Sequence, residues 1–403
     1  MATEMALVQT NLHFKRLTLT EAVAYIVGTN VGAAVLALPY AARQAGYPGI
    51  VAAAVLATFF SIVSHLYIAE SMLRTPSVTQ LVGLFRTYLF KGRANGLYLW
   101  FLFIMTIGVA IPTLTSYIIG GAQSISAILG ISTGAAQCIF LVPGMAIVWL
   151  GLKATGVLQK AASLLMGAVL LLLTFLSLGH QQAILSRLAH FDAGAFWPIL
   201  PVAIFTCLSQ NTVPEVVRGL AHEPRLVPKA IVYGLLINLV FVLVVPLSVF
   251  ALLPADKIAE VATTSWGRAL GLSGLIMANC FAFFALLTSF WGTAGTILTN
   301  IVDVLKLPSE WHLGYRLLSF AITLVPSLII ILCRFTSFVD LIKIAGSIGG
   351  VLLALLPVLI LWRARRHGAR SPEYIAPAWL GRPVQAGMIL FYLGTMIYAA
   401  LAL

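Results

Sequence analysis

Eleven apolar runs follow one another along the chain, each about as long as the 20 residues that a helix needs to cross a bilayer. Backbone groups left unpaired in hydrocarbon are costly, so such runs fold as helices. Of the 403 residues, 61% are hydrophobic and 9% are charged, which is more apolar surface than a soluble domain can bury. The sequence therefore predicts an all-α integral membrane protein with eleven transmembrane helices. Their expected bounds are 19–43, 49–72, 96–128, 135–151, 155–179, 196–220, 228–253, 270–300, 314–333, 336–362 and 385–403.

The positive charges favour one orientation of these helices. Most of the 24 Lys and Arg residues fall in short loops that alternate spans bring to one side, and the positive-inside rule makes that side cytoplasmic. The net charge of +12 is therefore explained by loop residues that orient the helices in the membrane. We expect no nucleic-acid partner. We expect a multi-pass protein of the cell (inner) membrane, with a cytoplasmic N-terminus and an extracytoplasmic C-terminus.

A polar break, residues 28–32 (GTNVG), interrupts the first apolar run. Two glycines four residues apart and Pro39 disfavour a continuous helix. An opened backbone survives in hydrocarbon only where it lines a cavity or meets a ligand, so we expect a substrate site here. Free N–H groups at the start of the next half-helix would hold a carboxylate. The substrate-binding residues expected at this break are Asn30, Val31, Gly32, Ala33 and Ala34. The alternative is that the two glycines only allow close helix packing.

A second break, residues 207–212 (CLSQNT), interrupts the sixth run ahead of Pro214. Four consecutive polar side chains at membrane depth are costly unless they face water or partners. We expect Cys207, Ser209 and Gln210 to contact substrate, the alternative being hydrogen bonds that only join helices. Each break lies in the first helix of a set of five, 19–179 and 196–362, and the two sets would run in opposite senses. One transmembrane transporter domain, 1–403, with helices 1 and 6 broken at the midplane and 385–403 as an extra helix, is the predicted architecture.

Residues 28–39 (GTNVGAAVLALP) resemble the first-helix motif of the bacterial hydroxy/aromatic amino acid permeases, GTxIGAGMLAxP. Residues 213–220 (VPEVVRGL), 229–234 (KAIVYG) and 285–292 (ALLTSFWG) agree with that family in the same order. These permeases belong with the amino acid/auxin permeases in the amino acid-polyamine-organocation superfamily, which has a leucine-transporter-like fold. The resemblance implies a secondary active, cation-coupled transporter of neutral, aromatic L-amino acids that works by alternating access.

The eighth span carries two neighbouring hydroxyls, Thr288 and Ser289, one turn after Ala285. The resemblance to sodium-coupled members of the fold implies that these residues and the carbonyls of Gly28 and Val31 form a five-oxygen Na+ site. The alternative is that the hydroxyls only bond the carbonyl one turn back in their own helix.

Proton coupling is the rival to sodium. In some proton-coupled relatives of the fold a lysine on the fifth helix takes the place of sodium, and Lys160 lies on that helix here. The alternative for Lys160 is that its long side chain reaches out to the membrane interface.

Four further side chains complete the expectations. Thr113 lies on one face of the third span, which we expect either to line the substrate pocket or to pack against neighbouring helices. His65 is expected as a packed or hydrogen-bonded residue within the second span. Glu215 and Arg218 are spaced to pair on one helical face. No nucleophile, metal cluster or phosphate loop has the required context, so no enzyme activity and no cofactor beyond Na+ or a proton are expected. An amino-acid-binding sensor or channel of the same fold, which does not concentrate its substrate, is the alternative function.

Overall fold

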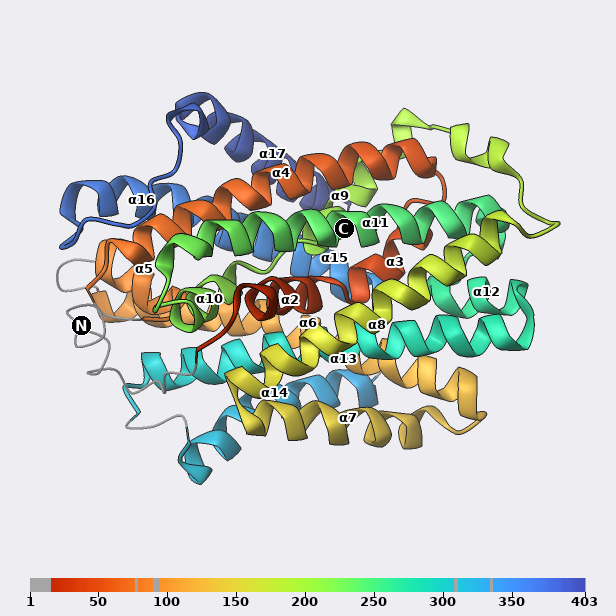
Figure 1. Ribbon diagram of the computed structural model, residues 1–403, viewed down its shortest axis with the longest axis horizontal. Helices are drawn as coiled ribbons and strands as arrows, with labels where there is room; N and C mark the ends of the chain where they lie inside the picture. Colours follow the sequence, from red (N-terminus) through yellow and green to blue (C-terminus); the bar gives the residue numbers. More distant parts are fainter. Residues whose placement is uncertain (1–15, 77–78, 90–94, 308–310, 334–335, 403) are drawn as a thin grey trace.

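The computed structural model describes residues 16–76, 79–89, 95–307, 311–333 and 336–402, and every regular element among them is a helix. Within these residues ten helices are long and apolar enough to cross a membrane, and a bent pair of shorter helices raises the number to eleven. The predicted all-α membrane architecture is therefore confirmed. Figure 1 shows the long helices lying side by side along the longest axis, with the two short helices of the bent pair among them.

The long helices follow the predicted apolar runs closely, whereas the short helices α5 and α12 lie between runs. Those of the first half are α2 (Leu19–Asn30), α3 (Ala33–Ala41), α4 (Gly46–Leu73), α5 (Leu81–Leu89), α6 (Asn95–Leu129), α7 (Thr133–Leu150) and α8 (Leu152–Leu178). Those of the second half are α9 (Leu200–Phe205), α10 (Val213–Gly219), α11 (Val227–Leu252), α12 (Ala262–Ala269), α13 (Gly271–Val304), α14 (Leu313–Cys333), α15 (Phe338–Gly349), α16 (Leu356–His367) and α17 (Arg382–Ala402).

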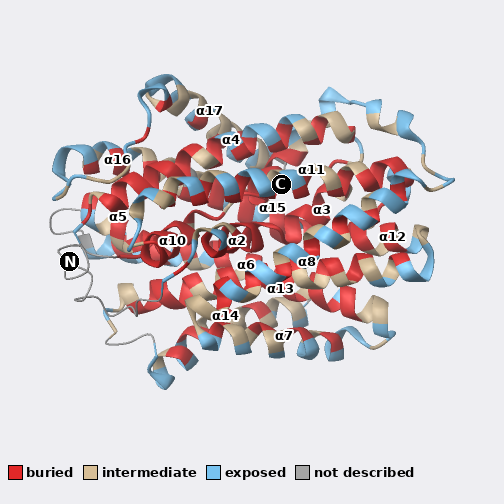
Figure 2. Ribbon diagram, in the orientation of Figure 1, coloured by how far each residue is buried: buried red, intermediate tan, exposed pale blue. Residues whose placement is uncertain are grey.

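The bent pair α2 and α3 occupies the interior of the molecule. Residues 24–39 are all buried, and Figure 2 shows α2, α3, α10 and α15 as mainly buried segments surrounded by helices with exposed faces. Large apolar side chains such as Leu171 and Phe175 on α8 are exposed, as expected for a helix that faces lipid. The broken helix therefore lies within the protein, where its open backbone can meet partners.

The start of α2 is set by a capping box. The backbone N–H of Thr18 donates to Glu21 Oε2 at 2.8 Å, and the N–H of Glu21 donates to Thr18 Oγ1 at 3.3 Å. Each side chain satisfies a donor that the first turn of a helix leaves free. Lys153 at the start of α8 pairs with the same Glu21 carboxylate. These contacts hold the first half-helix in place against α8.

The tenth span is less regular than the sequence predicts. The expected single helix 336–362 is an α-helix, a π-helical segment (Gly350–Leu355) and a second α-helix, α16. A π-helical segment leaves carbonyls less well paired than an α-helix, and the Leu353 carbonyl accepts a hydrogen bond from Ser64 Oγ on α4 at 3.2 Å. The irregular segment is thus held against the second span.

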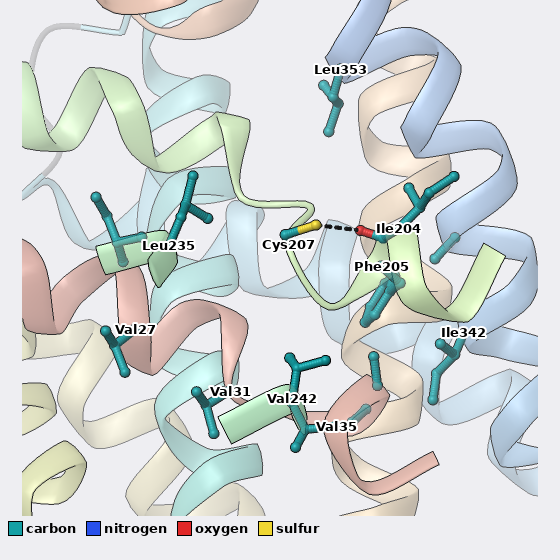
Figure 3. Packing of buried hydrophobic residues seen from close by; sticks show 14 of the residues in the cluster. Val27, Val31, Val35, Ile204, Phe205, Cys207, Leu235, Val242, Ile342 and Leu353 are labelled. Atoms are coloured by element: carbon teal, nitrogen blue, oxygen red, sulfur yellow. Dashed lines mark hydrogen bonds between the residues drawn. The ribbon is translucent and has the colours of Figure 1, made fainter. Parts of the chain in front are cut away.

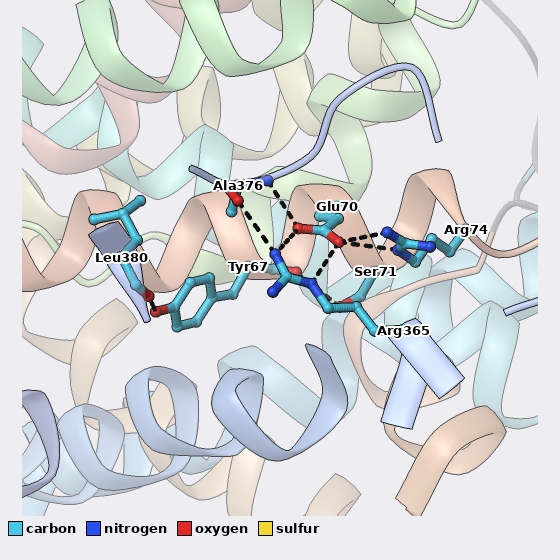
Figure 4. A network of polar contacts seen from close by, with 7 residues as sticks. All are labelled: Tyr67, Glu70, Ser71, Arg74, Arg365, Ala376 and Leu380. Carbon is cyan, nitrogen blue, oxygen red and sulfur yellow. Dashed lines mark hydrogen bonds and ion pairs between the residues drawn. The ribbon is translucent and has the colours of Figure 1, made fainter. Parts of the chain in front are cut away.

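A buried carboxylate on α4 binds both α16 and the segment that follows α16, as Figure 4 shows. Glu70 is fully buried and accepts from Arg365 through both carboxylate oxygens, each at 2.8 Å. Arg74 Nε donates to the same carboxylate at 2.9 Å and the Ala376 N–H at 2.8 Å. Three donor groups therefore offset the cost of burying one charge.

Candidate functional site

The first break is an open backbone between α2 and α3. The helices bend by 43° across Val31 and Gly32, whose ψ angles of 87° and −140° lie outside the helical region. Val35 N–H bonds the Gly32 carbonyl at 3.1 Å, but among the described residues the N–H groups of Gly32, Ala33 and Ala34 meet no acceptor. Three free donors at a helix N-terminus form a site that favours an anion. The predicted break of the first span is confirmed.

The second break separates α9 from α10, and neighbouring helices cap its carbonyls. Ser61 Oγ on α4 donates to the Cys207 carbonyl at 2.7 Å, and Asn238 Nδ2 on α11 donates to the Thr206 carbonyl at 2.8 Å. Figure 3 shows Cys207 in the turn beyond Ile204 and Phe205, with its thiol directed back at the Ile204 carbonyl. The open backbone is therefore stabilised by side chains of two other spans.

Asn30 and Ser209 join the two breaks directly. Asn30 Nδ2 donates to Ser209 Oγ at 2.7 Å, across 179 positions of sequence. His65 on α4 contacts the same hydroxyl, with Nε2 at 2.9 Å from Ser209 Oγ. The expectation that His65 is hydrogen-bonded is confirmed, but its partner lies on the broken helix as well as on α4. Sequence reasoning missed this role.

A cluster of oxygen atoms lies where α13 crosses α2. Ser289 Oγ is 3.0 Å from the Gly28 carbonyl and 3.1 Å from the Val31 carbonyl. One residue earlier, Thr288 Oγ1 bonds the carbonyls of its own helix, at 2.9 Å for Phe284 and 3.1 Å for Ala285. Three of the five predicted ion ligands are therefore in direct contact, and the other two contact each other next to them on α13.

Gln159 links this cluster to the fifth span, α8. Its Nε2 donates to the Thr288 carbonyl at 2.9 Å, and a Cβ added to Gly28 would lie 3.0 Å from its Cγ. Lys160, the predicted rival to sodium, is exposed on α8 and is not brought to the oxygen cluster. The helix therefore turns Gln159 inward and Lys160 outward.

A cavity of about 40 Å³ lies between the breaks, α6 and α13. That volume holds only a few water molecules, so an amino acid fits there only after side chains move. Of the residues expected to contact substrate, Asn30, Ser209 and Thr113 line this cavity, whereas Gln210 does not. The other lining residues are Thr29, Thr106, Val109, Ala110, Tyr117, Phe205, Leu208, Asn211, Thr212, Thr293, Thr296, Ile297 and Leu353.

Two neighbouring amides at the second break are placed differently. Asn211 lines the cavity, and its Oδ1 is buried without a hydrogen-bond partner among the described residues. Gln210 is fully buried, with neither amide atom paired within that part of the chain. Asn211 is therefore a cavity residue that sequence reasoning missed. Cys207, Val31, Gly32, Ala33 and Ala34 surround the breaks without lining the cavity.

A buried ion pair follows the second break. Glu215 and Arg218 on α10 pair at 2.5 Å, as their spacing predicted, and both side chains are 2% exposed. Glu215 Oε1 also accepts from Thr299 Oγ1 on α13 at 2.7 Å and from Gln80 Nε2 at 3.1 Å. The second half of the broken span is therefore attached to α13 and to the segment that precedes α5.

The chain matches the model of the tryptophan/tyrosine permease family over residues 15–399. A tryptophan-specific transport protein of Pseudomonas aeruginosa (strain UCBPP-PA14) is 25% identical to it over 406 residues, covering 94% of this chain and 93% of that protein. A protein of the same description from Haemophilus influenzae (strain ATCC 51907 / DSM 11121 / KW20 / Rd) is 26% identical and covers 85% of this chain and 86% of its own length.

Among solved structures, MhsT in complex with L-phenylalanine superposes with a TM-score of 0.65. The match covers 96% of this chain and 98% of that chain at 15% sequence identity. At this identity the likeness concerns the fold, and it extends over the whole transmembrane domain.

Proposed function

Since the chain belongs to the tryptophan/tyrosine permease family, we propose that it is a secondary active, cation-coupled transporter of neutral aromatic L-amino acids. Its family is one of permeases, so the chain is a transporter and not an enzyme. The observation that carries the proposal is the pair of opened helices joined by Asn30 and Ser209 beside a cavity. Broken helices in two corresponding spans are where transporters of this architecture bind substrate.

The substrate carboxylate binds at the first break. The N–H groups of Gly32, Ala33 and Ala34 are free donors at the positive end of α3, and they are buried. Hydrogen bonds from backbone N–H groups to a carboxylate are charge-assisted and stronger than neutral ones. The same groups give no such advantage to a neutral ligand, so an amino acid fits this break better than an uncharged aromatic compound.

The substrate side chain is aromatic, and L-tryptophan is the first candidate. The relatives from Pseudomonas and Haemophilus are described as tryptophan-specific, and the cavity here is lined by Tyr117 and Phe205 beside several apolar residues. Aromatic rings pair favourably edge to face or offset-stacked, so two ring side chains suit a ring on the ligand.

The coupling ion in this proposal is Na+, held by oxygens of Gly28, Val31, Ala285, Thr288 and Ser289. Two backbone carbonyls that already converge on one hydroxyl require little rearrangement to hold a cation. Proton coupling through Lys160 is the weaker alternative, because that side chain is exposed on the outer face of α8.

Transport proceeds by alternating access between two inverted repeats, 19–179 and 196–362, with 385–403 outside the repeats. The N-terminus is cytoplasmic and the C-terminus extracytoplasmic in the cell (inner) membrane, as the Lys and Arg bias favours. The wider assignment is to the amino acid/auxin permeases of the amino acid-polyamine-organocation superfamily.

Uptake into proteoliposomes tests the proposal. Labelled L-tryptophan should accumulate above its outside concentration when an inward sodium gradient is imposed, and should only equilibrate without one. Accumulation driven by a proton gradient alone would replace sodium with a proton. Equilibration under every gradient would identify a channel, and binding without uptake a sensor; either result would reject the transporter.

A further inference from the structure

We propose that His65, Ser209 and Asn30 form a hydrogen-bond relay of fixed direction, which holds Asn30 Oδ1 as the acceptor for the α-ammonium group of the substrate. His65 and Ser61 are then positioning residues that act through Asn30, although both lie on α4, outside either broken helix. This inference rests on the proposed function, because it assigns one group of an amino acid substrate to one atom of the same site.

The orientation of the Asn30 amide is fixed by an acceptor that cannot donate. Asn30 Nδ2 lies 2.9 Å from the Ile26 carbonyl and 2.7 Å from Ser209 Oγ. A carbonyl oxygen only accepts, so the amide nitrogen has to face Ile26. Reversing the amide would set its oxygen against the Ile26 carbonyl oxygen and break that bond. Both Nδ2 hydrogens are therefore used, and Oδ1 points away from these partners.

The direction of the next bond follows from His65. Its Nδ1 lies 2.8 Å from the Ser61 carbonyl, so Nδ1 carries a hydrogen and donates it. In the neutral imidazole Nε2 is then the acceptor, and the Ser209 hydroxyl donates to it across 2.9 Å. With its hydrogen committed to His65, Ser209 Oγ can only accept from Asn30. The relay thus runs from Asn30 through Ser209 to His65 and ends on the Ser61 carbonyl.

The Ser61 side chain fixes the far end of the relay to the second break. Its hydroxyl donates to the Cys207 carbonyl at 2.7 Å, while its own carbonyl receives the His65 hydrogen. His65 and Ser61 are both fully buried, so water does not compete for these bonds. Only one placement of the hydrogen atoms therefore satisfies all the hydrogen bonds among Ser61, His65 and Ser209.

Several backbone acceptors at the breaks are already engaged, whereas Asn211 Oδ1, which also lines the cavity, has no partner among the described residues. The carbonyls of Gly28 and Val31 accept from Ser289, and that of Thr206 accepts from Asn238. Asn30 Oδ1 receives no hydrogen bond from the described residues, and Asn30 lines the cavity. Asn30 Oδ1 is therefore held in one orientation, and both of its lone pairs can accept hydrogen bonds from a ligand.

The ammonium group is the donor that suits this position. Asn30 is two residues from the free N–H groups of 32–34, which would hold the carboxylate. The carboxylate and the ammonium of an α-amino acid are attached to the same carbon atom, whereas an aromatic ring extends away from both. An acceptor beside the carboxylate site therefore lies closer to the ammonium group than to any donor on the substrate side chain. Hydrogen bonds to charged groups are worth about tenfold to a hundredfold in affinity.

The test compares two ligands that differ at this one group, L-tryptophan and indole-3-propionate, which lacks the amine. Binding to the purified full-length protein is measured for both, with melting temperature as the check on folding. In the wild type L-tryptophan should bind more tightly. In Asn30→Ala, Ser209→Ala and His65→Leu, tryptophan affinity should fall about tenfold or more while indole-3-propionate affinity stays within about threefold.

Two further variants separate positioning from structural support. His65→Gln keeps an acceptor for the Ser209 hydroxyl and should recover most of the preference for tryptophan. Asn238→Ala removes the cap on Thr206 at the same break without touching the relay, so both ligands should weaken together. Equal losses of both ligands in His65→Leu and Ser209→Ala would overturn the relay. A wild type that binds neither ligand would instead reject the proposed function.

Discussion

A Cβ atom added to Gly32 would lie 2.3 Å from Ser289 Oγ, so α13 crosses the first break at a point where a side chain has no room. The same hydroxyl contacts the carbonyls of Gly28 and Val31. Glycine at position 32 thus serves two purposes, because it lets the backbone open and lets the oxygen of α13 approach it. The proposed substrate site and the proposed ion site are therefore adjacent parts of one break.

Gly32→Ala should abolish tight binding of both substrate and cation. The added methyl would press on Ser289 Oγ and on Tyr117 Cε1, 3.3 Å away, and so displace α13 or α6. Overpacking of this kind costs about 1–3 kcal/mol, which corresponds to roughly tenfold or more in affinity. Calorimetric titration with L-tryptophan measures it. Gly108→Ala on α6, where a Cβ meets nothing within 4 Å, is the matched control and should bind normally.

Thr288→Ala and Ser289→Ala should raise the sodium concentration that gives half-maximal uptake by about tenfold, since each removes an oxygen of the proposed sodium site. Uptake as a function of sodium concentration measures this shift. Thr395→Ala on α17 removes a hydroxyl that bonds only a carbonyl of its own helix, and it should leave the sodium curve unchanged. An unaltered sodium curve in both α13 variants would remove α13 from the ion site.

Gln159→Leu should weaken sodium dependence, whereas Lys160→Gln should not. Gln159 Nε2 supports the Thr288 carbonyl, so its loss frees an ion ligand to shift, while Lys160 is exposed on the other side of the helix. Uptake under separate sodium and proton gradients distinguishes the two variants. If Lys160→Gln uncouples transport from a proton gradient, proton coupling through Lys160 is correct and the sodium site is not.

Glu70→Gln should destabilise the protein by about 2 kcal/mol without changing substrate affinity, because it leaves Arg365, Arg74 and the Ala376 N–H with a neutral acceptor. Arg365 is 42% exposed, so part of the loss is recovered by water. Thermal unfolding in detergent measures the change. Asp340→Asn breaks a pair whose side chains are 53% and 44% exposed and should cost less than about 0.5 kcal/mol. A Glu70→Gln protein as stable as wild type would mean that Glu70 is not a structural clamp.

The backbone of the site was more predictable from sequence than its side chains. Glycine and proline act locally, so Gly28, Gly32 and Pro39 indicated the first break without knowledge of the neighbours. Side-chain direction depends on the phase of a helix and on what packs against it. A difference of one position therefore separates Gln159, which faces inward, from Lys160, which the proton-coupled alternative would require to face inward.

The partners supplied by other spans could not be read from the sequence. His65 was expected as a packed or hydrogen-bonded residue within the second span, but nothing local shows that Ser209 lies opposite it. Gln210 and Asn211 are adjacent polar amides, and the 3-10 turn that contains them decides which one lines the cavity. The π-helical segment of the tenth span begins at Gly350, after Gly349, and Pro357 follows it, but glycine and proline at these positions do not by themselves specify a π-helix.

In the proposed function, the opened backbone at residues 31–34 binds an aromatic amino acid together with a cation. The most direct measurement is the melting temperature of the purified protein with each of the twenty amino acids, in the presence and absence of sodium, for the wild type and Gly32→Ala. L-Tryptophan should stabilise the wild type most, sodium should increase that stabilisation, and both effects should be lost in Gly32→Ala. Stabilisation by no amino acid, or an undiminished response in Gly32→Ala, would contradict the proposed function.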